Sequence, residues 1–289
     1  GRGEMTILGS GTANGGISVL HALGLGRGCS LPIGLSTTVN IHDEHMDLHN
    51  DHHGLLDAVL HCWRKKELPS PNSVGWEVIS DVPVGQGLKS SAALACAALR
   101  ALNEYSWSGL SDSEIVDMAV ESQINCGCTV TGSMDDAWSA VDSGWKLVDP
   151  RLPASEAILF EGEIDEDVVV LVVLRGSREK AVNADSFSEN QHLFERALAS
   201  LTNGSVLDAL SSNGMAVASS TDDFEALRTC NMAIASGALA AGLSGSGPAI
   251  AIVCYPTDVH NVKNSMEQNG LEVMETRFVN SEVAKEEVR

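Results

Sequence analysis

One short segment constrains the fold of this chain more than any other. Residues 83–93 read Pro-Val-Gly-Gln-Gly-Leu-Lys-Ser-Ser-Ala-Ala, and they lie between a strand-like stretch at 74–81 and an alanine-rich, helix-like stretch that runs to about Tyr105. A glycine-bearing loop between a strand and a helix leaves backbone N–H groups unpaired at the positive end of a helix dipole. The segment therefore predicts a phosphate-binding loop.

The spacing of this segment excludes the two commonest phosphate loops. The four-residue gap of a Walker loop is missing ahead of Lys89, and no glycine follows Gly87 by three residues as a dinucleotide-binding loop requires. The remaining alternative is a plain helix N-cap with small residues for tight packing. A cap needs only one hydroxyl, whereas Ser90 and Ser91 supply two, so we favour a phosphate loop of another family.

The net charge of the chain limits the classes of partner that it can bind. The formal net charge is −21, and it is divided almost equally between residues 1–150 and 151–289. This balance argues against non-specific nucleic-acid binding, which depends on basic surface. It is typical of a highly soluble protein. Anionic substrates would be repelled at long range, so their binding must depend on local donors and on magnesium.

Other features predict a cytoplasmic protein that binds no membrane. No apolar run approaches the ~20 residues of a membrane span, and no basic and apolar leader is visible. Seven cysteines without a C-x-x-C pair predict reduced thiols, because Cys126-Gly-Cys128 is too tight for the usual zinc knuckle. The five histidines within 41–53 match no H-E-x-x-H site. We expect a solvated strand-to-helix connection there, with incidental metal binding as the alternative.

The pattern of apolar residues predicts two α+β halves, 1–150 and 151–289, that meet near Asp149-Pro-Arg-Leu-Pro153. The expected strands are 33–41, 74–81, 144–148, 168–174, 249–255 and 271–278. The expected helices are 51–66, 90–105, 111–125 (opened by a capping box of Ser111 and Glu114), a short one within 129–137, 222–241 and 259–268. A glycine loop is expected at 243–248.

Three motifs in order resemble those of the GHMP kinases. They are P-x-G-x-G-L-x-S-S-A at 83–92, T-x-T-G-x-x-D-D-A at 129–137 and S-G-S-G-P at 244–248. Within that superfamily, G-L-K-S-S and the opening at 9–28 resemble the archaeal shikimate kinases. The resemblance implies a two-domain α+β fold, with an ATP-binding N-terminal domain at 1–150, a C-terminal domain at 151–289, and the active site in the cleft between them.

The same resemblance implies an activity. It is transfer of the γ-phosphoryl group of ATP, with Mg2+, to the 3-hydroxyl of shikimate, in the synthesis of chorismate and aromatic amino acids. Two alternatives stay open. One is homoserine kinase or another small-alcohol kinase of the superfamily, and the other is an inactive relative that binds ATP and a ligand as a sensor. Neither nucleic acid nor membrane is expected as a partner, and the oligomeric state is not predicted.

Site residues follow from the matched motifs. Asp135 would lie beside the acceptor hydroxyl and accept its proton or orient it, with an ordinary pKa near ~4. Asp136 would point in another direction on the helix and support Asp135. The alternative is that both acids only favour a helix N-terminus. Magnesium would bind one of Ser90 and Ser91, together with Glu121, because the second acid of the family's glutamate pair is Gln123 here. The alternative for Glu121 is a solvated helix residue.

The remaining implied contacts concern ATP and the acceptor. ATP would contact the whole first motif and the glycine loop of the third motif. The alternative for that glycine loop is a tight helix-to-strand turn without a ligand. The acceptor would contact Thr12, Asn14 and Arg27 besides the two acids, and an arginine would hold its carboxylate, with Arg27, Arg175 and Arg178 as candidates. The ATP contacts are Pro83, Val84, Gly85, Gln86, Gly87, Leu88, Lys89, Ser90, Ser91, Ala92, Ala93, Gly245, Ser246 and Gly247.

Overall fold

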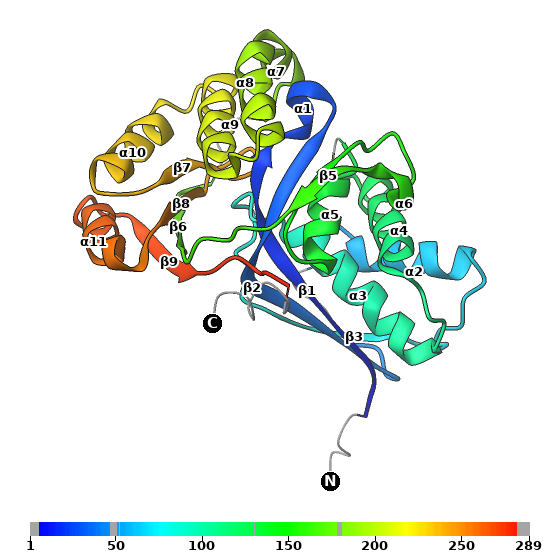
Figure 1. Cartoon of the computed structure of the whole chain (residues 1–289). Coiled ribbons are helices and arrows are strands. Elements are labelled where there is room, and N and C mark those ends of the chain that lie inside the picture. The colour runs from blue at the N-terminus through cyan, green and yellow to red at the C-terminus, as the bar shows by residue number, and fades with distance from the viewer. Residues whose placement is uncertain (1–5, 47–50, 52, 130, 178–180, 282–289) are drawn as a thin grey trace.

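The computed structural model describes residues 6–46, 51, 53–129, 131–177 and 181–281, and it contains two antiparallel sheets with helices packed on them (Figure 1). The first sheet has the order β1 (Ile7–Leu20), β2 (Gly28–His42), β4 (Trp145–Val148) and β5 (Ile158–Gly162), and β3 (Gly75–Ser80) also pairs with β2. The helices in this part of the chain are α1 (Ala22–Leu25), α2 (Leu55–Lys65), α3 (Ser90–Ser106), α4 (Asp112–Asn125), α5 (Met134–Val141) and α6 (Ala154–Ala157), and Figure 1 shows α1 apart from the others, at the end of the β1–β2 ribbon.

The second sheet lies wholly in the C-terminal half. Its order is β7 (Ala240–Leu243), β8 (Ile250–Cys254), β6 (Val169–Leu174) and β9 (Glu272–Thr276). Its helices are α7 (Ala184–Glu189), α8 (Gln191–Thr202), α9 (Val206–Ser220), α10 (Phe224–Ala235) and α11 (Val259–Gln268), with a 3-10 turn η1 (Pro256–Asp258) before the last. The structure thus confirms the predicted α+β class.

The long β1–β2 ribbon joins the two halves. It pairs from Ile7 with His42 to Leu20 with Cys29, and Figure 1 shows it running between the two groups of helices. Val39 at one end is buried in a core with α2 to α5, whereas Leu31 at the other end is buried in a core with β6 and β8. Each hydrophobic core therefore contains part of the same ribbon.

Glycines in β1 let α3 lie directly on the ribbon. A Cβ added at Gly9 would lie 2.4 Å from the Ala101 carbonyl oxygen, and one at Gly11 would lie 2.3 Å from that of Ala97. No side chain fits at either position without moving the helix. This contact positions α3 against the ribbon, and with it the loop that precedes α3.

Most predicted elements are confirmed, including the capping box of Ser111 and Glu114 at the start of α4. Three expectations need correction. The helix expected over 222–241 ends at Ala235, and Ala240–Leu243 forms β7. β1 and β5 were not among the expected strands. His42 belongs to β2 and is buried, with Nε2 3.5 Å from Glu77 Oε1, rather than lying in a solvated connection.

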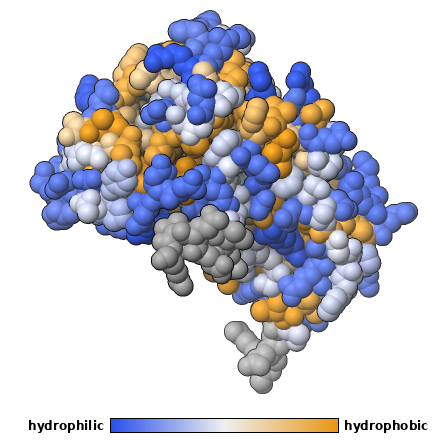
Figure 2. Space-filling model, in the orientation of Figure 1, coloured by the Kyte–Doolittle hydropathy of each residue, from blue (hydrophilic) through white to orange (hydrophobic). Residues whose placement is uncertain are grey.

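The boundary near 150 stays a prediction, but the first sheet does not stop there. β5 pairs with β4 and extends that sheet to Gly162. On the face shown in Figure 2, hydrophilic residues spread over both halves, and hydrophobic residues form separate patches. Within the described residues, no helix is both long and apolar enough to cross a membrane.

Candidate active site

The predicted phosphate loop has the backbone that a phosphate needs. Gly85, Gly87 and Lys89 all adopt the left-handed conformation, with φ of 73°, 84° and 65°. Lys89 is the N-cap of α3, and its side chain makes no capping hydrogen bond. The first turn of α3 therefore presents N–H groups without a side-chain cap, which is the arrangement that favours an anion. A left-handed lysine is strained, and such strain is concentrated at functional positions.

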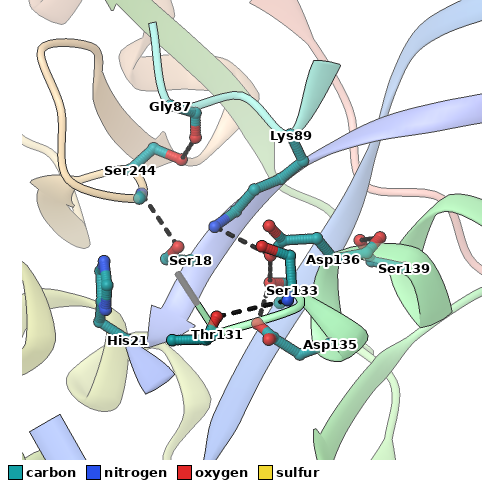
Figure 3. Close-up of polar contacts among 12 residues, drawn as sticks. Ser18, His21, Gly87, Lys89, Thr131, Ser133, Asp135, Asp136, Ser139 and Ser244 are labelled. Atoms are coloured by element: carbon teal, nitrogen blue, oxygen red, sulfur yellow. Dashed lines mark hydrogen bonds and ion pairs between the residues drawn. The ribbon is translucent and has the colours of Figure 1, made fainter. Parts of the chain in front are cut away.

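The third-motif glycine loop packs against the phosphate loop. Ser244 Oγ donates a hydrogen bond to the Gly87 carbonyl (2.8 Å), and the Ala249 N–H donates to that of Gln86 (3.0 Å). The Gly245 N–H donates to Ser18 Oγ on β1 (2.9 Å), as Figure 3 shows. A Cβ on Gly87 would lie 2.2 Å from the Ser244 carbonyl oxygen, so this contact requires glycine. The two motifs, although far apart in sequence, form one structural unit.

Ser246 and Gly247 complete the glycine loop. Ser246 Oγ lies 2.9 Å from His21 Nε2, and His21 follows the end of β1. Gly247 has φ of 79°, and its N–H donates to the Ser244 carbonyl (2.8 Å). The loop is thus held both by the phosphate loop and by the end of the ribbon.

Two carboxylates and one lysine meet beside the phosphate loop. Ser30 Oγ lies 2.7 Å from Asp135 Oδ2 and 3.1 Å from Asp136 Oδ1, and both acids open α5. Lys89 Nζ lies 3.0 Å from Asp136 Oδ1, and its side chain is only 9% exposed. Figure 3 shows Lys89 reaching from its loop toward Asp136. A cation from the phosphate loop is therefore ion-paired with the acid next to Asp135.

Burial and charge shift the proton affinity of Asp135. Burial, and next the charge of Asp136, raise its pKa from 3.8 to about 7, against the opposing effects of Lys89 and Ser30. The expected ordinary pKa near ~4 is therefore wrong. Since an efficient general base has a pKa near the operating pH, this carboxylate is better suited to accept a proton than the sequence suggested.

The structure also corrects the prediction for Asp136. It does not point away from its neighbour, because both carboxylates contact the same Ser30 hydroxyl. Sequence reasoning missed Ser30 altogether. Its only signal was a serine between the apolar Cys29 and Leu31 in a buried strand, since a buried polar side chain needs a partner.

Three expected ligands are not brought to this cluster by the contacts that the structure shows. The Glu121 carboxylate accepts a hydrogen bond from the Cys62 thiol on α2 (3.2 Å). Thr12 Oγ1 contacts Thr38 Oγ1 (2.9 Å), and Asn14 donates to the Ile33 carbonyl (3.1 Å). Thr12 lies six residues before Ser18 on β1, which corresponds to about 20 Å along a strand. Thr12 is therefore a poor candidate for contact with the acceptor. Asn14 stays a prediction, because it lies two residues before Gly16, where an added Cβ would lie 3.4 Å from the Lys89 side chain.

The candidate arginines differ in their surroundings. Arg27 directly precedes Gly28, where an added Cβ would lie 2.5 Å from Asp135 Oδ1, so its backbone adjoins the acid cluster. Arg175 is held by Asp223, with two contacts of 2.7 Å, and also donates to the Pro248 carbonyl. Arg178 lies outside the described residues. Arg27 is therefore the better placed of the two described candidates.

A cleft of about 790 Å³ opens in the C-terminal half. Arg175, Asn183, Asp223 and Phe224 are among its lining residues, and Ser246 and Pro248 connect it to the glycine loop. Asp135 is not part of its lining. The cleft thus borders the third motif but not the acid cluster.

The donors present are consistent with magnesium. Ser90 and Ser91 begin α3, and hydroxyl and carboxylate oxygens are ligands that Mg2+ accepts while it keeps several waters. Among the described residues, no three histidine, cysteine or acidic side chains cluster as a self-sufficient metal site. A magnesium ion here would therefore depend on the phosphates of its nucleotide, as in other phosphotransferases.

Comparison with known proteins gives the family. The GHMP kinase N-terminal domain model matches residues 54–144, and the GHMP kinase C-terminal model matches residues 223–271. A shikimate kinase of Pyrococcus abyssi is 30% identical over 87% of this chain and 93% of its own length. A shikimate kinase of Methanobrevibacter smithii is 26% identical over 92% and 95%. The chain belongs to the GHMP kinases.

Solved structures support the GHMP kinase fold over nearly the whole chain. The mevalonate kinase of Methanococcus jannaschii superimposes with a TM-score of 0.75 at 15% identity, covering 97% of this chain and all of the other. A structure described as a putative homoserine kinase from Listeria monocytogenes gives a TM-score of 0.67 at 18% identity, covering 94% and 97%. At these identities the likeness concerns the fold alone.

Proposed function

We propose that this GHMP kinase is a shikimate kinase that transfers the γ-phosphoryl group of ATP to the 3-hydroxyl of shikimate. The choice of acceptor is supported by relatives named shikimate kinase that match most of the chain. The choice of chemistry is supported by one observation: Lys89 of the phosphate loop is ion-paired with Asp136, the neighbour of Asp135. This ion pair supports a site in which phosphate binding and proton acceptance adjoin.

In the proposed reaction, the N–H groups of the phosphate loop and the first turn of α3 hold the phosphates of ATP. A bound magnesium ion, with Ser90 or Ser91 as its protein ligand, would neutralise phosphate charge. Ionised Asp135 accepts the proton of the acceptor hydroxyl as that oxygen bonds to the γ-phosphorus and the bond to ADP breaks. Lys89 is ion-paired with Asp136, and the Ser30 hydroxyl contacts both carboxylates. Arg27 is the proposed partner of the acceptor carboxylate.

An acceptor panel tests this proposal. The purified protein is given ATP and Mg2+ with shikimate, homoserine or mevalonate, and ADP release is measured. Phosphorus NMR then locates the phosphate on the product. We expect turnover with shikimate and a 3-phosphate product. Turnover with homoserine but not with shikimate would show that the acceptor is homoserine. ATP binding without turnover of any acceptor would favour the inactive sensor.

A further inference from the structure

The turn that ends α4 brings two thiols together. Cys126 is the C-cap of α4, and Gly127 adopts the left-handed conformation, with φ of 74°. The Cys128 N–H donates to the Gln123 carbonyl (3.0 Å), and the Gly127 N–H donates to that of Ile124 (3.1 Å). This pair of hydrogen bonds defines a Schellman motif, which folds the chain back over the helix end. As a result the sulfur atoms of Cys126 and Cys128 lie 2.7 Å apart.

The pair is both close and accessible. A disulfide bond is about 2.05 Å long, so the two sulfur atoms need to approach by less than about 1 Å. Both cysteines are free and partly exposed, whereas Cys29, Cys62, Cys96 and Cys254 are buried. Cys230 is the other partly exposed cysteine, and it lies on α10 in the C-terminal half. A small reagent can therefore reach the pair without unfolding the protein.

We propose that Cys126 and Cys128 form a redox-active dithiol, which a low-molecular-weight disulfide converts reversibly into an intramolecular disulfide. One protein thiol loses its proton and attacks a sulfur atom of the small disulfide, which releases one small thiol and forms a mixed disulfide. The second protein thiol then attacks the protein sulfur of that mixed disulfide and releases the other small thiol. Two protein thiols lose two electrons and two protons, and one small disulfide is reduced to two thiols.

The location of the pair connects it to both predicted phosphate-transfer motifs. The Cys128 thiol lies beside Ser91 in the first turn of α3. The next residue, Thr129, contacts the Ser133 hydroxyl (2.8 Å) just before the two acids. Closure of the disulfide would remove the thiol that contacts Ser91 and constrain the segment that leads to Asp135. The site itself does not depend on which acceptor the enzyme phosphorylates.

The test measures the disulfide directly and needs no activity assay. The full-length protein is equilibrated with reduced and oxidised glutathione, quenched with acid and analysed by intact-mass and peptide spectrometry after alkylation. Because burial raises the pKa of the Cys128 thiol to about 12, exchange is slow and the readout is the equilibrium, not the rate. We expect the oxidised protein to lose two hydrogens, gain no glutathione, and regain both alkylation sites after reduction.

Single substitutions provide the controls. The Cys126→Ser and Cys128→Ser variants should not lose two hydrogens, and Cys230→Ser should behave like the wild type. If the serine variants do not fold, phenylarsine oxide provides a second measurement on the wild type, because it condenses with two neighbouring thiols and releases one water. We expect one arsenical per protein, protecting both cysteines from alkylation. Two retained alkylation sites after oxidation, or a glutathione adduct without the internal bond, would overturn the proposal.

Discussion

At the scale of single residues, Asp135 combines its proposed catalytic role with a cost to the fold. We expect Asp135→Asn to lower kcat by ~10³-fold or more while ATP still binds, because the acceptor proton loses its base. The pKa of Asp135 is raised from 3.8 to about 7 in the folded protein, so the folded state binds more protons over that range. Its ionisation therefore reduces stability as the pH rises through about 7.

Two measurements separate these effects. Steady-state kinetics gives kcat, and calorimetric titration gives ATP affinity. Denaturant unfolding at pH 8 should show no loss of stability in Asp135→Asn, because the variant has no buried charge to solvate. Wild-type kcat in Asp135→Asn would remove this carboxylate from the mechanism, whereas loss of ATP binding would make its role structural.

After burial, the neighbouring acid Asp136 has the largest effect on the pH at which the proposed base works. Since ionised Asp135 is the active form in the proposed reaction, kcat should rise with pH through about 7. Asp136→Asn removes a negative charge and releases Lys89, and both changes lower the pKa of Asp135. The inflection of the kcat profile should therefore move to lower pH. The matched control is Asp112→Asn, which removes an acid paired with Arg100 far from the cluster. An unmoved inflection in Asp136→Asn would contradict the coupling.

At the scale of elements, the contact between the two loops makes a prediction about stability. Gly85 and Gly87 both have positive φ, but an added Cβ meets nothing within 4 Å at Gly85 and lies 2.2 Å from the Ser244 carbonyl oxygen at Gly87. Gly85→Ala should therefore cost only the backbone strain, about 1 kcal/mol. Gly87→Ala should cost roughly 1–3 kcal/mol more, the usual range for overpacking.

The free energy of unfolding in urea measures that difference, and Gly85→Ala is the matched control because it carries the same backbone strain. A larger KM for ATP should accompany the loss of stability in Gly87→Ala, since the glycine loop supports the phosphate loop. Equal stability of the two variants would show that the loops separate without cost.

The elements that sequence could predict are those whose signals are local. The capping box of α4 and the phosphate loop before α3 depend on neighbouring residues, and both were visible. β1 was not, because its glycine-rich stretch has little strand propensity and depends on pairing with β2 and on the close approach of α3. The end of α10 had a local signal in Gly237, which has φ of 116°. The alanines around it obscured the point at which the helical pattern of apolar residues gives way to the strand pattern of β7.

The site shows the same limit. The motifs located Asp135 and Asp136, whereas Ser30 lies 105 residues before Asp135 and meets it only because β2 passes α5. The pKa of Asp135 could not be predicted either, since it depends on burial and on the orientation of a neighbour. The motifs of the sequence thus indicate which residues to propose for the site, and packing decides how they are arranged.

At the scale of the whole molecule, the shared ribbon should make the two halves unfold together. The N-terminal core contains Val39 and the C-terminal core contains Leu31, and both side chains belong to β2. Neither core can lose its part of β2 without opening the ribbon that the other core also uses. We therefore expect one cooperative transition, despite the two sheets.

Tryptophan fluorescence in a Trp145→Phe background offers a sharp test, because Trp63, Trp76 and Trp138 are buried in the N-terminal core, whereas Trp145 is buried in the core that contains Leu31. Its transition in urea should coincide with that of far-UV circular dichroism, which reports both halves. Leu31 lies in the C-terminal core, yet Leu31→Ala should still lower the free energy of unfolding that tryptophan fluorescence reports, by about 2–5 kcal/mol. Val39→Ala is the matched control in the N-terminal core, and it should shift both signals equally. If Leu31→Ala moved the circular dichroism signal alone, the halves would unfold independently and the ribbon would not couple them.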